Sequence, residues 1–265
     1  MTKIVSVHSF RGGTGKSNTT ANLAALAAGQ GLRVGVVDTD IASPGIHVLF
    51  GLEEQQVTHS LNDYLWGKCD IQQTAHDVTA NLGWADKEHP ADTEHPGAGG
   101  RLFLVPSSIK VGEITRILRE GYDVGLLNDG FQDLIQALDL DFLMIDTHPG
   151  LNEETLLSIA LSDVLLIVLR PDQQDYQGTG VTVEVARRLR VPCMMLVVNK
   201  VPAAFPPAQV KAHVERAYQA EVAAVLPHSD EMMALASSDI FAIRYPDHPI
   251  TAALRQVAEW LMAQT

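Results

Sequence analysis

Short apolar runs rich in β-branched residues recur along this chain, and most are followed by a longer segment with helical character. The runs predicted to form strands are Ile4–His8, Arg33–Asp38, Leu102–Pro106, Phe142–Asp146, Asp163–Leu169, Cys193–Asn199 and Val222–Leu226. The segments predicted to form helices are Lys16–Gln30, Gly125–Leu138, Glu153–Ala160, Gly178–Arg190, Pro207–Gln219 and Ile250–Met262. Strands as apolar as these are typical of parallel sheets covered by helices. The alternation therefore predicts an α/β fold: a doubly wound, mostly parallel sheet with helices on both faces, whose ligands bind at the carboxyl ends of the strands.

Composition sets the size and setting of this fold. With 265 residues, 46% of them hydrophobic, the chain suits a single domain spanning residues 1–265. The polar stretch around residues 84–100 is rich in Pro and Gly and is expected to be a surface loop, with His89 and His95 solvated rather than bound to metal. The first residues lack the long apolar stretch and small-residue cleavage site typical of a signal peptide, no run is long enough to span a membrane, and Cys69 and Cys193 lack metal-type spacing. A cytoplasmic protein with reduced thiols is expected.

The segment after the first predicted strand is rich in glycine and leads directly into the first predicted helix. It reads FRGGTGKSN, from Phe10 to Asn18. Its glycines let backbone N–H groups converge on phosphate oxygens, and the start of the helix points its positive dipole end at the same anion. Lys16 would supply a cation for the β- and γ-phosphates, and Ser17 a hydroxyl for Mg²⁺. The alternative is a glycine turn with an incidental Lys-Ser pair, which the flanking strand and helix disfavour.

The run GGTGKS preceded by a basic residue resembles the deviant Walker A motif of the MinD/ParA family of P-loop ATPases, usually written KGGxGK(S/T). The resemblance covers nearly the whole chain and implies ATP and Mg²⁺ as cofactors. The loop residues it implies for nucleotide binding are Gly12, Gly13, Thr14, Gly15, Lys16, Ser17 and Asn18. In that family a signature lysine reaches across an ATP-dependent homodimer to the partner's nucleotide. Arg11 stands at this position; it keeps the charge but differs from lysine in reach and geometry. An arginine supplied in trans is a known way to stabilise phosphoryl transfer.

Carboxylates follow two of the predicted strands. Asp38 and Asp40 belong to VDTDIASPGIH, which resembles the family's switch I, and the resemblance makes Asp40 the acid that positions the hydrolytic water. Asp38 by itself also fits a turn or cap residue. Asp146 ends the run FLMID in the manner of a Walker B strand, and the following Thr147–Gly150 resembles switch II. The implied Mg²⁺ ligands are Ser17, Asp40 and Asp146. His148 stands where the family has a small residue or proline; a plain loop histidine is favoured over a γ-phosphate sensor.

Two further strand ends are predicted to hold the base. An amide at Asn199, which ends LVVN, can pair with an adenine edge, and the family uses an asparagine there for that purpose. An asparagine at a strand end is otherwise a common turn residue. Pro227 and His228 follow the next strand, as the family's purine-flanking loop does. Arg170–Asp172 resembles a segment between switch II and the base site and is assigned to the rim that faces the dimer partner.

The surface that such a dimer would use is less clearly marked. The C-terminal helix carries Leu254, Val257 and Leu261 on one face and a single arginine, so it is expected to pack on the core, and membrane binding is disfavoured. The net charge of −13 argues against a protein that coats nucleic acid with its whole surface. A local basic patch for nonspecific DNA remains open, although a solvated helix face is slightly favoured for its residues, which are Arg187, Arg188, Arg190, Lys211 and Arg216.

The resemblance therefore implies an ATPase that hydrolyses ATP slowly and forms a homodimer on ATP binding, with Lys16, Asp40 and Arg11 in catalytic roles. Its use would be the positioning or partition of DNA or a protein cargo, with a protein activator or cargo adaptor. The expected location is the cytoplasm, either free or associated with the nucleoid. One alternative is a metabolic or metallocluster-maturation ATPase of the same fold, which Cys69 and Cys193 support poorly because they form no CxxC pair. A second is an ATP-binding regulatory module with little turnover.

Overall fold

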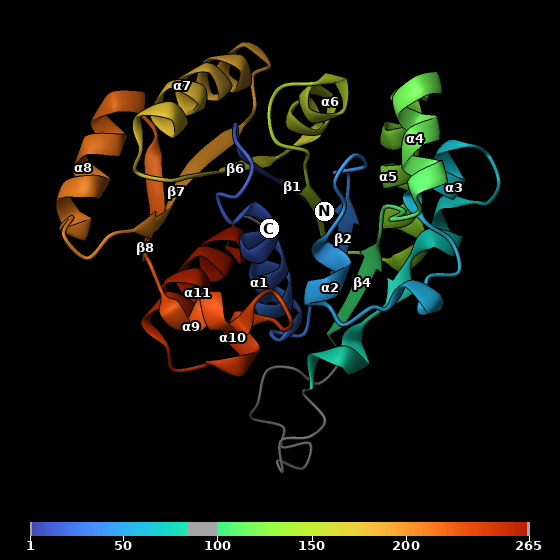
Figure 1. The fold of residues 1–265 in the computed structure, drawn as a ribbon, viewed down its shortest axis with the longest axis horizontal. Coiled ribbons are helices and arrows are strands. Elements are labelled where there is room, and N and C mark those ends of the chain that lie inside the picture. Colours follow the sequence, from blue (N-terminus) through green and yellow to red (C-terminus); the bar gives the residue numbers. More distant parts are fainter. Residues whose placement is uncertain (1, 84–99, 264–265) are drawn as a thin grey trace.

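The computed structural model describes residues 2–83 and 100–263 and arranges them around one eight-stranded sheet (Figure 1). The strands are β1 Lys3–His8, β2 Arg33–Asp38, β3 His76–Asp77, β4 Arg101–Val105, β5 Phe142–Asp146, β6 Val164–Leu169, β7 Cys193–Val201 and β8 Glu221–Pro227. All seven predicted strands are present, shifted at their ends by at most two residues. The surface loop predicted around residues 84–100, with His89 and His95, lies outside the described residues except for Gly100.

The order of the strands confirms the doubly wound sheet. They lie side by side as β3-β4-β2-β5-β1-β6-β7-β8. Every neighbouring pair is parallel except β3 and β4, which are antiparallel. Asp38 at the end of β2 stands in register with Asp146 at the end of β5. The two carboxylates singled out in the sequence therefore lie next to each other at the carboxyl edge of the sheet.

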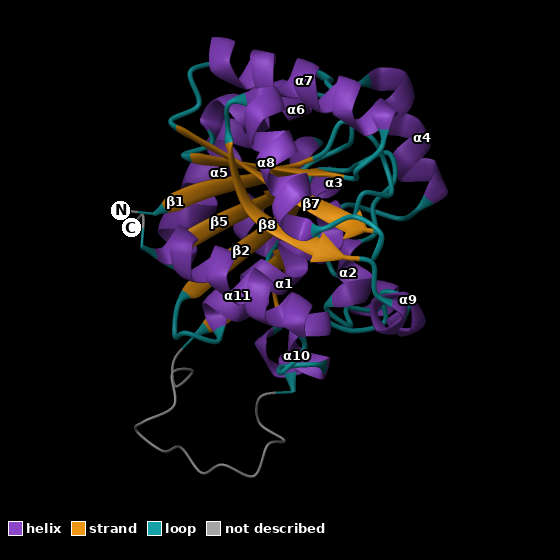
Figure 2. Cartoon of the chain, turned by 90° about the vertical axis from the view of Figure 1, so that its left-hand side faces the viewer, coloured by secondary structure: helices purple, strands orange, loops and turns teal. Residues whose placement is uncertain are grey.

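Helices cover both faces of the sheet (Figure 1, Figure 2). Helices α1, α10 and α11 lie on one face, and α5 to α8 lie on the other. The α-helices are α1 Lys16–Ala28, α2 Ile46–Leu49, α3 Leu61–Leu65, α4 Val111–Glu120, α5 Gly125–Leu138, α6 Glu153–Leu161, α7 Gln173–Arg188, α8 Pro207–Tyr218, α9 Asp230–Leu235, α10 Phe241–Arg244 and α11 Pro249–Met262. The described residues also form three short 3₁₀ turns, η1 Glu54–Gln56, η2 Ile71–Thr74 and η3 Thr79–Leu82.

The C-terminal helix packs as the sequence predicted. Leu254, Val257 and Leu261 on α11 are buried in the same apolar cluster as Leu23 of α1. Helix α1 itself is buried on almost every side, which suits its small Ala, Thr and Asn side chains. The packing of α1 in the core therefore fixes the position of its first residue and of the glycine-rich loop before it.

The largest difference from the predicted boundaries is at α7, which begins at Gln173 and not at Gly178. The carboxylate of Asp172 accepts hydrogen bonds from the backbone N–H groups of Gln174 and Asp175, so it caps a helix that glycines obscured in the sequence. Close packing explains why a glycine stands at position 178, because a Cβ there would collide with the ring of Phe10. Short helices between residues 46 and 82 and between 230 and 244, together with α4, were not predicted because each is brief or weakly buried.

Candidate nucleotide-binding site

The glycine-rich loop joins the centre of the sheet to the buried helix α1. Gly13 and Gly15 have φ angles of 77° and 98°, in the left-handed region that side chains disfavour. Lys16 begins α1 with only 7% of its side chain exposed, and its Nζ donates to Asp146 Oδ1 at 2.8 Å. Thr20 donates to the same carboxylate oxygen at 3.2 Å. The loop is therefore fastened to the end of β5, with the lysine ammonium at the position where the helix dipole is positive.

Three carboxylates meet at this edge. Asp38 is fully buried and accepts from the backbone N–H of Asp40 at 3.0 Å. Burial and the neighbouring charge of Asp146 raise the pKa of Asp38 to about 8, although Lys16 opposes the shift. Burial also raises the pKa of Asp40, although Lys16 and His148 oppose that shift. Such a concentration of acids is stabilised by nearby positive charge, here from Lys16.

A magnesium ion accompanying a nucleotide suits these residues. Mg²⁺ usually keeps several waters and takes only one or two protein carboxylates besides phosphate oxygens. Asp40 and Asp146 offer carboxylates, and the half-buried Ser17 directly follows Lys16, whose side chain binds Asp146. In the part of the chain that the structure describes, no group of three or more His, Cys, Asp and Glu side chains, these three carboxylates included, is arranged to hold a metal ion on its own. The donor set therefore fits a metal that arrives with a phosphate better than one bound by the protein alone.

The histidines at this edge are both held by hydrogen bonds. His8 is buried, and its Nδ1 lies 2.8 Å from Thr147 Oγ1. Burial lowers the pKa of His8 to about 3, helped by the charges of Lys16 and His148. His148 is partly exposed, and its Nε2 lies 3.7 Å from Asp40 Oδ1. His148 of switch II therefore lies next to Asp40 of switch I. The favoured interpretation of His148 as a plain loop residue did not predict this proximity.

A cavity of about 190 Å³ lies beside the loop, where the sequence predicted the base. Its lining residues include all three predicted base contacts, Asn199, Pro227 and His228, and also Gly15 and Asn18 of the loop. Met232 and Met233 of α9 line it as well. Thioether side chains are polarizable and make favourable contacts with aromatic rings. These lining groups are compatible with a planar base.

Asn199 has a second connection that the sequence did not indicate. Its Nδ2 donates to the carbonyl of Thr14 at 2.8 Å, and its Oδ1 accepts from the backbone N–H of Lys200 at 2.8 Å. Lys200 Nζ in turn donates to the carbonyl of Gly13 at 2.8 Å. Asn199 and Lys200, near the C-terminal end of β7, thus both hold the phosphate loop, and the adjacency of Asn and Lys there was the only signal available for it in the sequence. The amide of Asn199 would have to share or exchange these bonds to read a base.

Arg11 does not extend freely from the loop. Its guanidinium lies 3.7 Å from Asp172 and 3.8 Å from Asp175, at the start of α7. Arg170 binds Asp175 more closely, with Nε donating to its carboxylate at 2.9 Å. Arg11 and the Arg170–Asp172 segment, predicted separately, therefore lie together. Because the Arg11 side chain is 39% exposed and its ion pairs are long, they hold it only weakly.

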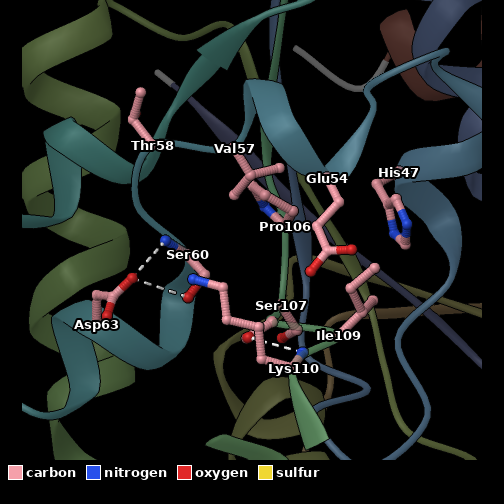
Figure 3. Close-up of a pocket in the computed structure, with 11 residues that line it drawn as sticks. His47, Glu54, Val57, Thr58, Ser60, Asp63, Pro106, Ser107, Ile109 and Lys110 are labelled. Atoms are coloured by element: carbon pink, nitrogen blue, oxygen red, sulfur yellow. Dashed lines mark hydrogen bonds between the residues drawn. The ribbon is translucent and has the colours of Figure 1, made fainter.

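A second, smaller cavity of about 30 Å³ lies beside switch I, between α2 and the loop after β4 (Figure 3). His47, Asp63 and Lys110 are among its lining residues. Ser107 joins this loop to the start of switch I by donating to the carbonyl of Asp38 at 2.7 Å. The volume accommodates one or two waters, so this cavity is not a second nucleotide site.

The predicted basic patch is weaker than its sequence suggested. Arg187 donates to the carbonyls of Tyr218 and Gln219 and so caps the end of α8 instead of presenting its charge. Lys211 lies 3.7 Å from Glu215 on the same helix. These contacts support the solvated, structural interpretation of this face.

Comparison with known proteins decides the family. The profile of the CobQ/CobB/MinD/ParA nucleotide-binding domain matches residues 5–240. This chain belongs to that family. The resemblance read from GGTGKS is thereby confirmed, and so is the nucleotide-binding P-loop class that it implied.

The individual proteins that this chain resembles carry different functional descriptions. An uncharacterized ATP-binding protein of Methanocaldococcus jannaschii is 29% identical over 97% of this chain and 87% of its own. An iron-sulfur cluster carrier protein of Methanococcus maripaludis is 30% identical over 74% of this chain and 59% of its own. The septum site-determining protein MinD of Pyrococcus horikoshii, solved with Mg-ADP, superposes with a TM-score of 0.77 at 19% identity, covering 98% of this chain and 96% of its own. No helix within residues 2–83 and 100–263 has the length and apolar character of a membrane span.

Proposed function

We propose that this protein is an ATPase that binds ATP with Mg²⁺ at the loop after β1 and dimerises when it does. The observation that carries the proposal is the position of Lys16. It lies at the N-terminus of a buried helix, against the Asp38–Asp146 carboxyl pair and beside the cavity lined by Asn199. Membership of a nucleotide-binding family and the ATP-binding description of the Methanocaldococcus relative support it.

The residues divide the work by position. The backbone N–H groups from Gly12 to Asn18 and the ammonium of Lys16 hold the phosphates, once Lys16 exchanges its bond with Asp146 for a phosphate oxygen. Ser17, Asp40 and Asp146 would hold Mg²⁺, which when bound neutralises charge on the phosphates. Asp40 orients the attacking water. Catalysis of this kind rests mainly on positioning and on electrostatic stabilisation of the transferring phosphoryl group.

Arg11 is proposed to act across the dimer. Its long ion pairs to Asp172 and Asp175 leave the guanidinium within reach of the surface, and the side chain is partly exposed. A dimer partner that brings a second nucleotide to this face offers phosphate oxygens to the planar fork of the arginine. The cellular use would be positioning or partition of a cargo, with a protein partner that triggers hydrolysis and release.

A metallocluster role is the second candidate, because one relative of 30% identity is an iron-sulfur cluster carrier. A cluster shared across a dimer needs cysteine thiolates close to the two-fold axis. Cys69 and Cys193 are both partly buried, and burial raises the pKa of each thiol. Because Cys69 and Cys193 are far apart in the sequence and form no CxxC pair, the positioning ATPase is preferred.

The test is ATP turnover by the purified protein with Mg²⁺, alone, with DNA, and after anaerobic incubation with iron and sulfide. We expect slow basal turnover, and an ATP-dependent dimer on gel filtration with light scattering. Stimulation by DNA supports a nucleoid-bound positioning role, whereas a stable iron-sulfur chromophore transferred to an acceptor protein supports the cluster role. Tight ATP binding with neither turnover nor dimer would overturn the proposal in favour of a regulatory module.

A further inference from the structure

His148 of switch II lies close to Asp40 of switch I. Its Nε2 lies 3.7 Å from Asp40 Oδ1. Its side chain is 31% exposed and that of Asp40 is 13% exposed, so both can meet a molecule entering the site. The charges of Lys16 and Asp146 also act on Asp40, which places the pair at the phosphate end of the site and not at the base cavity.

The chemistry of the His148 ring follows from its hydrogen bond. Nδ1 lies 2.6 Å from the carbonyl of Pro149, and a carbonyl only accepts, so the proton must be on Nδ1. In the neutral ring Nε2 therefore carries a lone pair and is an acceptor. Nε2 of the neutral ring and the carboxylate of Asp40 are thus both hydrogen-bond acceptors, and neither can donate to the other.

The backbone on both sides of this pair is held in place. Thr155 Oγ1 donates to the carbonyl of His148 at 3.2 Å. The backbone N–H of Asp40 donates to Asp38 at 3.0 Å, and the N–H of Ser43 donates to Asp40 Oδ1 at 3.1 Å. The two acceptors are thus presented by fixed segments, one from each switch.

Two acceptors at this separation repel each other unless a shared donor lies against both. A water molecule has two protons and can donate one to each acceptor, which leaves an oxygen lone pair free. We propose that Asp40 and His148 together hold the attacking water, with His148 Nε2 as the second acceptor in the hydrolysis. This inference rests on the proposed ATPase function and names a further catalytic residue for it.

The step balances with ATP and water alone. The water oxygen forms a bond to the γ-phosphorus, and the bond from that phosphorus to the bridging oxygen of ADP breaks. Asp40 accepts the proton that the water loses and passes it to the released phosphate. His148 keeps its hydrogen bond to the other proton and so fixes the direction of the lone pair. Positioned acceptors of this kind contribute roughly 10²-fold to 10⁴-fold in rate.

The experiment compares His148→Ala and His148→Gln with the wild type in Mg-ATP turnover, ATP affinity and ATP-dependent dimerisation. His213→Gln is the matched control, because His213 is an exposed histidine on α8 whose ring lies 5.7 Å from that of Tyr176. We expect His148→Ala to lower kcat about 10²-fold, with KM, ATP affinity and dimerisation within twofold of wild type. His148→Gln keeps an acceptor oxygen at the end of its side chain and should lose less than tenfold.

Several results would overturn the inference. Wild-type turnover that His148→Ala leaves within twofold removes His148 from the reaction while leaving the ATPase intact. A loss of ATP affinity or dimerisation equal to the loss of kcat makes His148 a structural contact between the switches. If His148→Ala does not fold, a folded His148→Gln that is as slow as Asp40→Ala contradicts the acceptor role. Absence of wild-type turnover defeats the proposed function itself, and this inference with it.

Discussion

The three glycines of the phosphate loop make different demands, and alanine at each separates them. Gly12 has an ordinary φ, and a Cβ there would meet nothing within 4 Å. Gly13 has a φ of 77° but also has open space for a Cβ. Gly15 has a φ of 98°, and its Cβ would collide with Asn199 Nδ2. Alanine should therefore cost nothing at Gly12, backbone strain alone at Gly13, and backbone strain together with a steric clash at Gly15.

The magnitudes follow from these environments. Gly12→Ala should change the free energy of unfolding by less than about 0.5 kcal/mol, as at other open surface sites. Gly13→Ala places a side chain in the left-handed region at about 1–2 kcal/mol. Gly15→Ala adds the displacement of Asn199 from the carbonyl of Thr14, and an unsatisfied buried polar group costs about 1–3 kcal/mol. Its total cost is about 2–5 kcal/mol, the sum of these two ranges.

The assay is urea unfolding of the nucleotide-free protein, followed by circular dichroism and fluorescence. In an Asn199→Ala background the clash disappears, so Gly15→Ala should then cost only the strain seen at Gly13. Equal costs at positions 12 and 15, or no relief from Asn199→Ala, would refute the contact between the loop and β7.

Three further perturbations address the chemistry. Asp40→Ala should bind ATP normally and accumulate an ATP dimer on gel filtration, and finding only monomer while wild type dimerises would mean that Asp40 has another role. Arg11→Ala should alter unfolding stability by less than about 1 kcal/mol because its ion pairs are long and its side chain is 39% exposed, yet slow turnover by roughly 10³-fold if it acts in trans; unchanged turnover would exclude that action. The pKa of His8 is lowered to about 3 from an unfolded value of 6.5, so its contribution is complete above pH 6.5 and is lost as the pH falls toward 3. The stability of wild type relative to His8→Gln should therefore fall by about 1 kcal/mol between pH 6.5 and 5.5, and a pH-independent difference would contradict a neutral buried His8.

Much of this architecture was readable from the sequence because buried parallel strands are nearly continuous apolar runs. The same reasoning placed Asp38, Asp146 and Asn199 at strand ends, and the strand order then brought the two aspartates into register. What it could not supply were pairings between distant segments. The bonds from Asn199 and Lys200 to the phosphate loop depend on how β7 lies beside it.

Arg11 shows the same limit from another side. The sequence marked its unusual identity, but its partners Asp172 and Asp175 lie more than 150 positions away and meet it only through the packing of α7. The sequence did not predict the proximity of His148 to Asp40 for a related reason, because only the folded chain brings switch II against switch I. Residues that act alone at strand ends are visible in a sequence, whereas residues that act in pairs across segments are not.

The central claim is that the loop at Arg11–Asn18 binds ATP through Lys16. Isothermal titration of the wild type and of Lys16→Ala with ATP and Mg²⁺ tests it directly, with thermal melts to show that both are folded. Melts are needed because Lys16 forms a buried ion pair with Asp146. We predict one ATP bound per wild-type chain and no measurable binding by folded Lys16→Ala. Micromolar-range binding retained by Lys16→Ala, or no binding by the wild type, would contradict the account.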